Sequence, residues 1–276
     1  MRSEESHEEQ GAPSPDTSHG DRAGAGGYQS VAQPASPVHP SAHASFQGEL
    51  GAAGAQISPE ELKGFISTLR SPDEDRCTAY INGLLGRGIN AETIFLELLD
   101  SAAVRLGEMW DDDDCDFVDV TVALGRLQRI LRDLSHQFLA DRATPEMVGR
   151  VLLSSIPGEQ HTLGLFMVAE FFIREGWDVR IGAPLSASEL GSLVRETRFD
   201  VVGFSVASSE RLSHVKRTIR QLRRDSQNRS LSVLVGGPVF RERPTLATQV
   251  GADGTAGDAR TAPTIARLLI SQGDAC

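Results

Sequence analysis

The sequence predicts an α/β protein with a doubly wound parallel sheet, preceded by a four-helix bundle and a disordered N-terminal arm. Three observations support this fold class. Apolar residues recur at helical spacing between residues 58 and 139, and short apolar runs alternate with helical stretches after Pro145. Residues 1–55 hold few bulky apolar side chains. We expect three regions: the arm at 1–55, the bundle at 56–143 and the α/β domain at 148–272.

The composition is that of an ordinary soluble protein. The chain has 276 residues, of which 39% are hydrophobic and 24% are charged. No apolar run approaches the roughly 20 residues of a membrane-spanning helix, and the first thirty residues lack the basic and apolar pattern of a secretory signal, so we expect a cytoplasmic protein. The net charge of -11 disfavours strong sequence-independent binding of nucleic acid by the whole chain. Cys77, Cys115 and Cys276 lack CxxC spacing and are expected to be reduced thiols.

The arm is rich in Gly, Pro, Ser, Ala and Gln, and its acidic residues outnumber its basic ones. It cannot bury enough apolar surface to offset the entropy lost on ordering. We expect a disordered acidic arm. A segment that folds on contact with a partner is the alternative.

Four amphipathic helices with short connections are expected after the arm. The first begins at Ser58-Pro59-Glu60-Glu61, where an N-cap serine, a proline and a capping-box glutamate coincide. The same signal at Ser71-Pro72-Asp73-Glu74 predicts the start of a second helix, which runs to a turn at 86–88. Asn90 can cap a third, which ends near Trp110, and the fourth covers about 118–139. This set predicts a small bundle.

Strands and helices then alternate. The expected strands are 151–153, 177–181, 201–204 and 231–235, and the expected helices are 161–174, 187–197, 209–225 and 260–270. This alternation predicts a parallel sheet covered by helices on both faces. Ligands of such sheets bind beyond the carboxyl ends of the strands.

Three loops at those carboxyl ends hold unusual residues. They are Glu159-Gln160-His161-Thr162-Leu163-Gly164, Ser205-Val206-Ala207-Ser208-Ser209 and Gly236-Gly237-Pro238. Taken singly, each has an ordinary explanation: His161 as a surface histidine, for example, or Gly236-Gly237 as a strand-end turn. Their combination, separated by residues 165–204 and 208–235, is far more specific.

This constellation resembles the cobalamin-binding domain family, whose pattern is Asp-x-His-x-x-Gly, then Ser-x-Leu, then Gly-Gly. The resemblance covers residues 150–270 and implies a Rossmann-like or flavodoxin-like domain with a five-stranded sheet. It implies that His161 coordinates cobalt from the lower face of hydroxocobalamin or adenosylcobalamin. The implied cofactor-binding residues are Glu159, His161, Thr162, Gly164, Ser205, Ala207, Gly236, Gly237 and Trp110, and no catalytic residue is implied.

The chemistry of these residues agrees with that role. Imidazole nitrogen suits cobalt, and Glu159 can accept a hydrogen bond from the second ring nitrogen. Ser205 can hydrogen-bond a heterocyclic nitrogen, and paired glycines let backbone approach a flat nucleotide. Two residues depart from the family pattern: Glu159 replaces Asp and Ala207 replaces Leu.

The predicted bundle resembles the helical cap of corrinoid proteins, in which a tryptophan packs over the upper ligand of cobalt. Trp110 is the candidate here, and an aromatic residue that closes a helix end is the alternative. In the related photoreceptor repressors, Glu-His stands where this chain has Val120-Thr121. Those repressors also carry a MerR-type DNA-binding domain, which residues 1–55 cannot supply, so direct DNA binding of that kind is excluded.

The chain resembles the PpaA/AerR antirepressor family of purple photosynthetic bacteria. The matching segments are Trp110-Asp111-Asp112-Asp113, Asp116-Phe117-Val118-Asp119-Val120-Thr121 and Arg126-Leu127-Gln128. The resemblance implies a light-responsive regulator that is not an enzyme. Its implied partner is a photosystem-gene repressor of the PpsR or CrtJ type, and it would reach DNA only through that repressor.

Several alternatives stay open. A corrinoid methyl carrier would use the same His161 and cap, and a module without cofactor would use only its surface. The basic stretch at 210–229 is a solvated face or a docking surface for an acidic partner or a DNA backbone. The acidic run at 111–114 is better explained as a solvated loop than as a cation site. His136 and His214 are possible upper ligands without further support.

Overall fold

The computed structural model describes residues 56–140, 147–156, 162–182 and 185–273. The predicted arm lies outside these ranges, as do Glu159, His161 and Cys276. None of the helices in the described ranges combines the length and apolarity that spanning a bilayer requires. The predicted boundaries between the three regions stay predictions.

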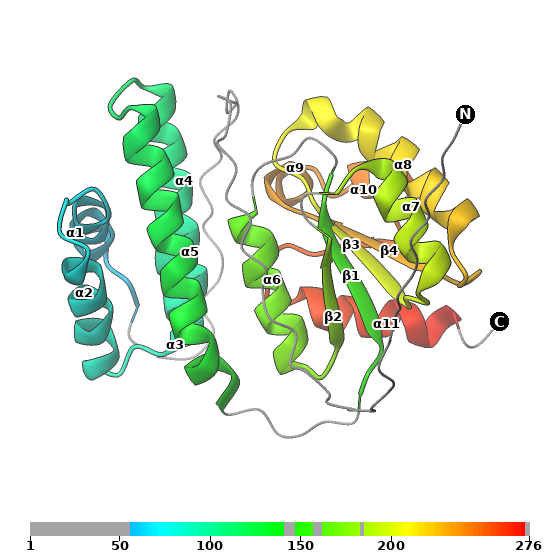
Figure 1. The fold of residues 1–276 in the computed structure, drawn as a ribbon, viewed down its shortest axis with the longest axis horizontal. Coiled ribbons are helices and arrows are strands. Elements are labelled where there is room, and N and C mark those ends of the chain that lie inside the picture. Colours follow the sequence, from blue (N-terminus) through cyan, green and yellow to red (C-terminus); the bar gives the residue numbers. More distant parts are fainter. Residues whose placement is uncertain (1–55, 141–146, 157–161, 183–184, 274–276) are drawn as a thin grey trace, which may run out of the picture. The chain divides into compact units, whose positions relative to one another are not determined.

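Four helical segments precede the sheet (Figure 1). They are α1 (Pro59–Leu69), α2 (Asp75–Gly86), a segment made of α3 (Ala91–Thr93), the π-helical η1 (Ile94–Leu99) and α4 (Asp100–Asp111), and α5 (Phe117–Ala140). The predicted capping box is present, since the Ser58 hydroxyl accepts a hydrogen bond from the Glu61 N–H at 3.2 Å. The Glu61 carboxylate in turn accepts one from the Ser58 N–H at 2.7 Å. The Asn90 side chain likewise caps α3.

The predicted start of α2 is wrong by three residues. The Ser71 hydroxyl accepts a hydrogen bond from the Asp73 N–H, and the Asp73 carboxylate accepts one from the Asp75 N–H. These side chains therefore hold a turn. The helix begins after it, at Asp75.

The α/β part contains five parallel strands in the order β2-β1-β3-β4-β5, which confirms the predicted fold class. The strands are β1 (Arg150–Ser155), β2 (Asp178–Gly182), β3 (Val201–Ser205), β4 (Ser232–Gly236) and β5 (Gly254–Thr255). The helices are α6 (Leu163–Arg174), α7 (Ala187–Glu196), the 3-10 turn η2 (Ser209–Arg211), α8 (Leu212–Asp225), α9 (Pro238–Glu242), α10 (Leu246–Val250) and α11 (Ala262–Gly273). The resemblance implied five strands, which is confirmed, but the sequence pattern did not locate β5, α9 or α10.

Helices cover both faces of this sheet (Figure 1). One core cluster joins the sheet to α7, α8 and α10, and another joins it to α6 and α11. The opposite side of α6 belongs to the bundle core, through Leu163, Met167 and Phe171. Because α6 packs on the sheet and on the bundle, it is apolar on both sides. Helix α6 thus connects the two parts of the molecule.

Candidate functional site

Two of the three unusual loops meet at the carboxyl edge of the sheet. Ser155, Ser205 and Gly236 are direct register partners, each the last residue of its strand. The Val206 N–H then donates to the Gly236 carbonyl at 3.0 Å, so pairing of β3 with β4 continues into the loops. The arrangement places a hydroxyl next to a glycine where parallel sheets bind ligands.

Gly237 brings the backbone after β4 unusually close to the loop after β3. Its φ is 98°, a left-handed value that favours glycine. A Cβ atom at this position would lie 2.5 Å from the Val206 carbonyl oxygen. The site therefore has a floor made of backbone, which only glycine allows.

The described end of the loop after β1, residues 162–164, lies beside the loop after β3. Thr162 precedes α6, and Gly164 is exposed in its first turn. A Cβ atom on Gly164 would lie 4.0 Å from the Ser205 hydroxyl oxygen. His161 directly precedes Thr162 in the chain but, like Glu159, lies outside the described residues. The structure thus unites Thr162, Gly164 and Ser205 with the glycine pair, and Ala207 follows in the same loop as Ser205.

Thr255 adds a polar atom that the sequence did not single out. It pairs with Val235, one residue before Gly236, near the carboxyl end of β5. Its hydroxyl is buried and has no hydrogen-bond partner among the described residues. Leaving such a group unpaired costs about 1–3 kcal/mol, so the hydroxyl is available to a further partner.

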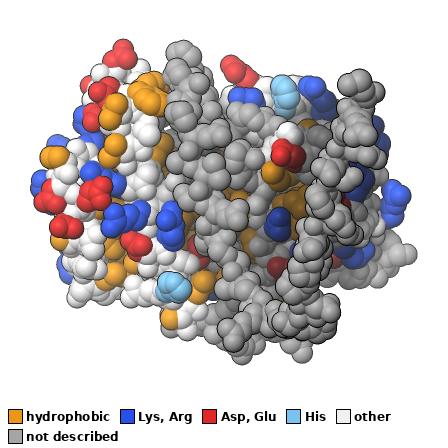
Figure 2. Space-filling view, viewed as in Figure 1, with side chains coloured by type: hydrophobic (Ala, Val, Ile, Leu, Met, Phe, Trp, Pro, Cys, Tyr) orange, Lys and Arg blue, Asp and Glu red, His pale blue; other side chains and the backbone are white. Residues whose placement is uncertain are grey.

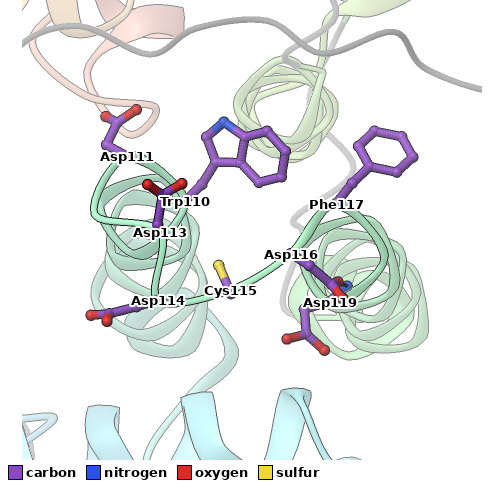
Figure 3. Close-up of a pocket in the computed structure, with 8 residues that line it drawn as sticks. All are labelled: Trp110, Asp111, Asp113, Asp114, Cys115, Asp116, Phe117 and Asp119. Atoms are coloured by element: carbon purple, nitrogen blue, oxygen red, sulfur yellow. Dashed lines mark hydrogen bonds between the residues drawn. The ribbon is translucent and has the colours of Figure 1, made fainter.

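Trp110 lies in the last turn of α4, just before the connection to α5. Its ring meets Phe117 edge-on, with centroids 6.3 Å apart, and it is half-buried. A cavity of about 710 Å³ at this turn is lined by Trp110, Asp111, Asp113, Asp114, Cys115, Asp116, Phe117 and Asp119. In Figure 3 Asp111 and Asp114 point in different directions, Asp116 and Asp119 lie together at the start of α5, and the rings of Trp110 and Phe117 lie on one side of the turn.

This cavity does not form a metal centre. No group of three or more His, Cys, Asp or Glu side chains in the described ranges is placed to hold a metal ion. Desolvation by burial raises the pKa of the Cys115 thiol, so the thiol is protonated at neutral pH. We therefore place the candidate site at the sheet edge and treat Trp110 as a residue of the cap.

Helix α5 packs beside α6, the helix that follows the first loop. The Gln128 side chain donates a hydrogen bond to the Thr162 hydroxyl at 3.3 Å, and the Ser135 hydroxyl donates one to the buried Glu170 carboxylate at 2.6 Å. The rings of Phe138 and Phe171 meet edge-on. These contacts attach the bundle to the element that carries the first loop.

Ion pairs join the bundle to the loops at two further points. Glu92 of α3 pairs with Arg174 at 2.7 Å and with Arg260, after β5, at 2.5 Å. Asp100 of α4 pairs with Arg241 of α9 at 3.7 Å. Desolvation raises the pKa of Asp100, and the Arg241 guanidinium offsets part of that rise. Sequence patterns do not mark these residues, because charged side chains on exposed helices are common.

Two other histidines of interest are exposed on helices. His136 is exposed on α5 and His214 is exposed on α8. Neither makes a described contact with the residues at the carboxyl edge, so neither gains support as an upper ligand from the structure.

The described residues fit the cofactor that the resemblance implies. Ser205, Ala207, Gly236 and Gly237 form a rim without bulky side chains, and an added Cβ at Gly237 would collide with backbone. The unpartnered Thr255 hydroxyl lies nearby in the sheet. Such a rim admits a flat heterocycle and offers it hydroxyl groups.

Comparisons with known proteins agree with this fit. The B12 binding domain family matches residues 149–266. An uncharacterized 20.5 kDa protein of Rhodobacter capsulatus, encoded in the bchF-crtJ intergenic region, is 33% identical over 165 residues, which are 60% of this chain and 85% of that protein. A corrinoid protein of Desulfitobacterium hafniense strain Y51 is 23% identical over 192 residues, covering 67% of this chain and 88% of its own.

A solved structure shares the fold. The monomethylamine corrinoid protein of Methanosarcina barkeri superposes with a TM-score of 0.64 at 14% identity. The match covers 76% of this chain and 98% of that one, so it includes helices as well as the sheet. At this identity the likeness concerns the fold alone.

Proposed function

The chain belongs to the family of B12-binding-domain proteins that includes the Rhodobacter capsulatus protein, and from this premise we propose a cobalamin-dependent regulator that is not an enzyme. One observation carries the cofactor part of the proposal. Ser205 and Gly236 lie side by side at the carboxyl edge of the sheet, next to the α6 turn that follows His161. Open parallel sheets bind their ligands at this edge.

Each residue of the site has a proposed task. His161 is the cobalt ligand, and Glu159 accepts a hydrogen bond from its second ring nitrogen. Ser205, Ala207 and the glycine pair line the crevice for the nucleotide tail. Bound cobalamin supplies a cobalt centre that absorbs visible light and exchanges axial ligands.

Trp110 is the proposed cap residue on the upper side of the cofactor. The proposal is supported by a contact between the bundle and the first loop. Gln128 of α5 donates a hydrogen bond to Thr162, which directly follows His161. A shift of the bundle is passed along α5 to the first turn of α6, because the two helices share a packed interface. The cap and the proposed cobalt ligand are thus coupled.

The proposed partner is a repressor of the PpsR or CrtJ type. The support is the position of the Rhodobacter capsulatus relative, which is encoded between bchF and crtJ. We propose that the protein acts as an antirepressor and that its cofactor state and light decide how it changes the DNA occupancy of this repressor.

A gel-shift assay of the repressor on a photosystem promoter tests the regulatory proposal. Cobalamin-loaded wild type should change the fraction of promoter bound, with different results in darkness and light. The variant His161→Ala should have no such effect. Unchanged occupancy with fully loaded wild type would rule out the antirepressor role.

A corrinoid methyl carrier is the alternative function. The fold does not separate the two, because a monomethylamine corrinoid protein shares it. Sequence identity favours the regulator. This chain is 33% identical to the bchF-crtJ protein and 23% identical to the corrinoid protein of Desulfitobacterium hafniense. A carrier would exchange a labelled methyl group with a methyltransferase, and a regulator would not.

A further inference from the structure

The outer side of α8 carries cations that the cofactor proposal does not use. Helix α8 buries Val215, Ile219 and Leu222 against the sheet. Its opposite side exposes four residues that we call the α8 basic face: Lys216, Arg217, Arg220 and Arg224. Within the described ranges, none of the four makes an ion pair with a carboxylate. Figure 2 shows Lys and Arg side chains over α8, at the upper right.

Two carboxylates beside α8 already have partners of their own. Asp225 pairs with Arg195 at 3.0 Å, and Asp253 pairs with Arg223 at 2.8 Å. Among the described residues the α8 basic face thus has no carboxylate paired with it, in a chain whose net charge is -11. Four clustered cations without counter-charges repel one another, and an external anion would relieve that repulsion.

The spacing of the cations suits an extended anion. Lys216, Arg220 and Arg224 follow one another at intervals of four residues, so each step rises about 6 Å along one side of the helix. Arg217 lies beside this row. A row of this kind can contact successive charges of a linear polyanion.

The residues around the α8 basic face favour phosphate groups, rather than a protein surface, as its binding partner. Stable protein interfaces need apolar or aromatic anchors at their centre. The exposed large apolar side chains in the described ranges are Val104, Phe117, Val118, Val122, Met147 and Leu268, and none is on α8. Protein–DNA interfaces, by contrast, are polar and strongly positive.

We propose that the α8 basic face binds the phosphate backbone of duplex DNA without sequence preference. Four contacts are too few to hold an acidic protein on DNA at physiological salt, so the face acts when the repressor brings the protein to its promoter. Its role at a promoter rests on the proposed repressor partner, whereas DNA binding by the face does not depend on the cofactor, since α8 packs on the face of the sheet opposite to α6.

Fluorescence anisotropy with a labelled duplex of arbitrary sequence tests the inference. Four phosphate contacts predict a slope of log K against log salt of about -3.6, so binding should weaken roughly fiftyfold between about 50 and 150 mM salt. The triple variant Lys216→Glu/Arg220→Glu/Arg224→Glu should bind at least tenfold more weakly at low salt. Protein with and without cobalamin should give the same result, which keeps this test separate from the cofactor proposal.

A control variant of equal net charge isolates the face from overall charge. Lys63, Arg132 and Arg180 are exposed outside α8. The variant Lys63→Glu/Arg132→Glu/Arg180→Glu should keep the salt slope. The neutral variant Lys216→Gln/Arg220→Gln/Arg224→Gln, which avoids the repulsion of added carboxylates, should also lose binding while keeping its melting temperature.

Three results would overturn the inference. The first is no binding by wild type at low salt, and the second is an equal loss in the α8 variant and its charge-matched control. The third is an α8 variant that keeps DNA binding but loses the repressor in the absence of DNA. That last result would mark the face as a protein-docking surface.

Discussion

At the residue scale, Gly237 decides how closely the loops after β3 and β4 can approach. Its left-handed backbone and the 2.5 Å approach of a Cβ to the Val206 carbonyl leave no room for a side chain. The close approach in turn keeps the rim of the site flat. Gly236 differs, because its Cβ would lie 3.6 Å from the Ala256 carbonyl, an ordinary contact.

We predict that Gly237→Ala lowers the free energy of unfolding by about 1–3 kcal/mol and reduces cobalamin retention. Urea denaturation and the absorbance of the desalted protein measure the two effects. Gly257→Ala is the matched control, because nothing lies within 4 Å of its Cβ, and it should change stability by less than about 0.5 kcal/mol. If Gly237→Ala and Gly257→Ala were equally stable, the close approach of Gly237 to the Val206 carbonyl would be contradicted.

Some residues of the candidate site could be predicted from the sequence, and others could not. Ser205 and Gly236 could be predicted because each ends an apolar strand, and parallel strands end at one edge. Thr255 could not, because its role depends on a hydroxyl left unpaired by folding. The placement of His161 and Glu159 stays a prediction, since both lie outside the described residues.

At the element scale, long periodic segments were predictable and short ones were not. The 24-residue α5 shows its apolar stripe plainly in the sequence. Helices α9 and α10 have five residues each and β5 has two, which is too few for a repeat to be visible. Strand β5 exists because β4 offers it an edge, so tertiary pairing decides its position.

The ion pair between α4 and α9 gives a prediction at this scale. Burial raises the folded-state pKa of Asp100 above its unfolded value, so ionisation of Asp100 disfavours the folded state. The stability that protonated Asp100 contributes is present below its unfolded pKa and is lost as pH rises through the folded pKa. Asp100→Asn should therefore keep or raise stability at neutral pH and flatten the fall in stability as pH rises above the ordinary Asp pKa of about 3.9.

Arg241→Met should act in the opposite direction. It leaves the Asp100 carboxylate without its cation, and we expect a loss of about 1 kcal/mol in urea unfolding at neutral pH. The loss is moderate because the Arg241 and Asp100 side chains are 35% and 39% exposed. Lower stability of Asp100→Asn than of Arg241→Met would contradict this account of the pair.

At the scale of the whole molecule, Glu92 connects the bundle to the α/β part through Arg174 and Arg260. We predict that Glu92→Ala keeps cobalamin retention but weakens the light-dependent change in repressor occupancy, because the cap is less firmly coupled to the loops. Promoter gel shifts in darkness and light measure the change. Glu74→Ala is the control, since Glu74 pairs with Arg129 within the bundle. If both variants show the same light-dependent change in repressor occupancy, Glu92 does not couple the bundle to the loops.

The central claim concerns the whole molecule: a cobalamin held by His161 at the carboxyl edge of the sheet. The most direct test is the visible spectrum of protein reconstituted with hydroxocobalamin and desalted. Wild type should retain cofactor with a base-off, histidine-coordinated spectrum that His161→Ala lacks. His136→Ala, which changes an exposed histidine of α5, should match wild type. Colourless wild type, or an unchanged spectrum in His161→Ala, would contradict the claim.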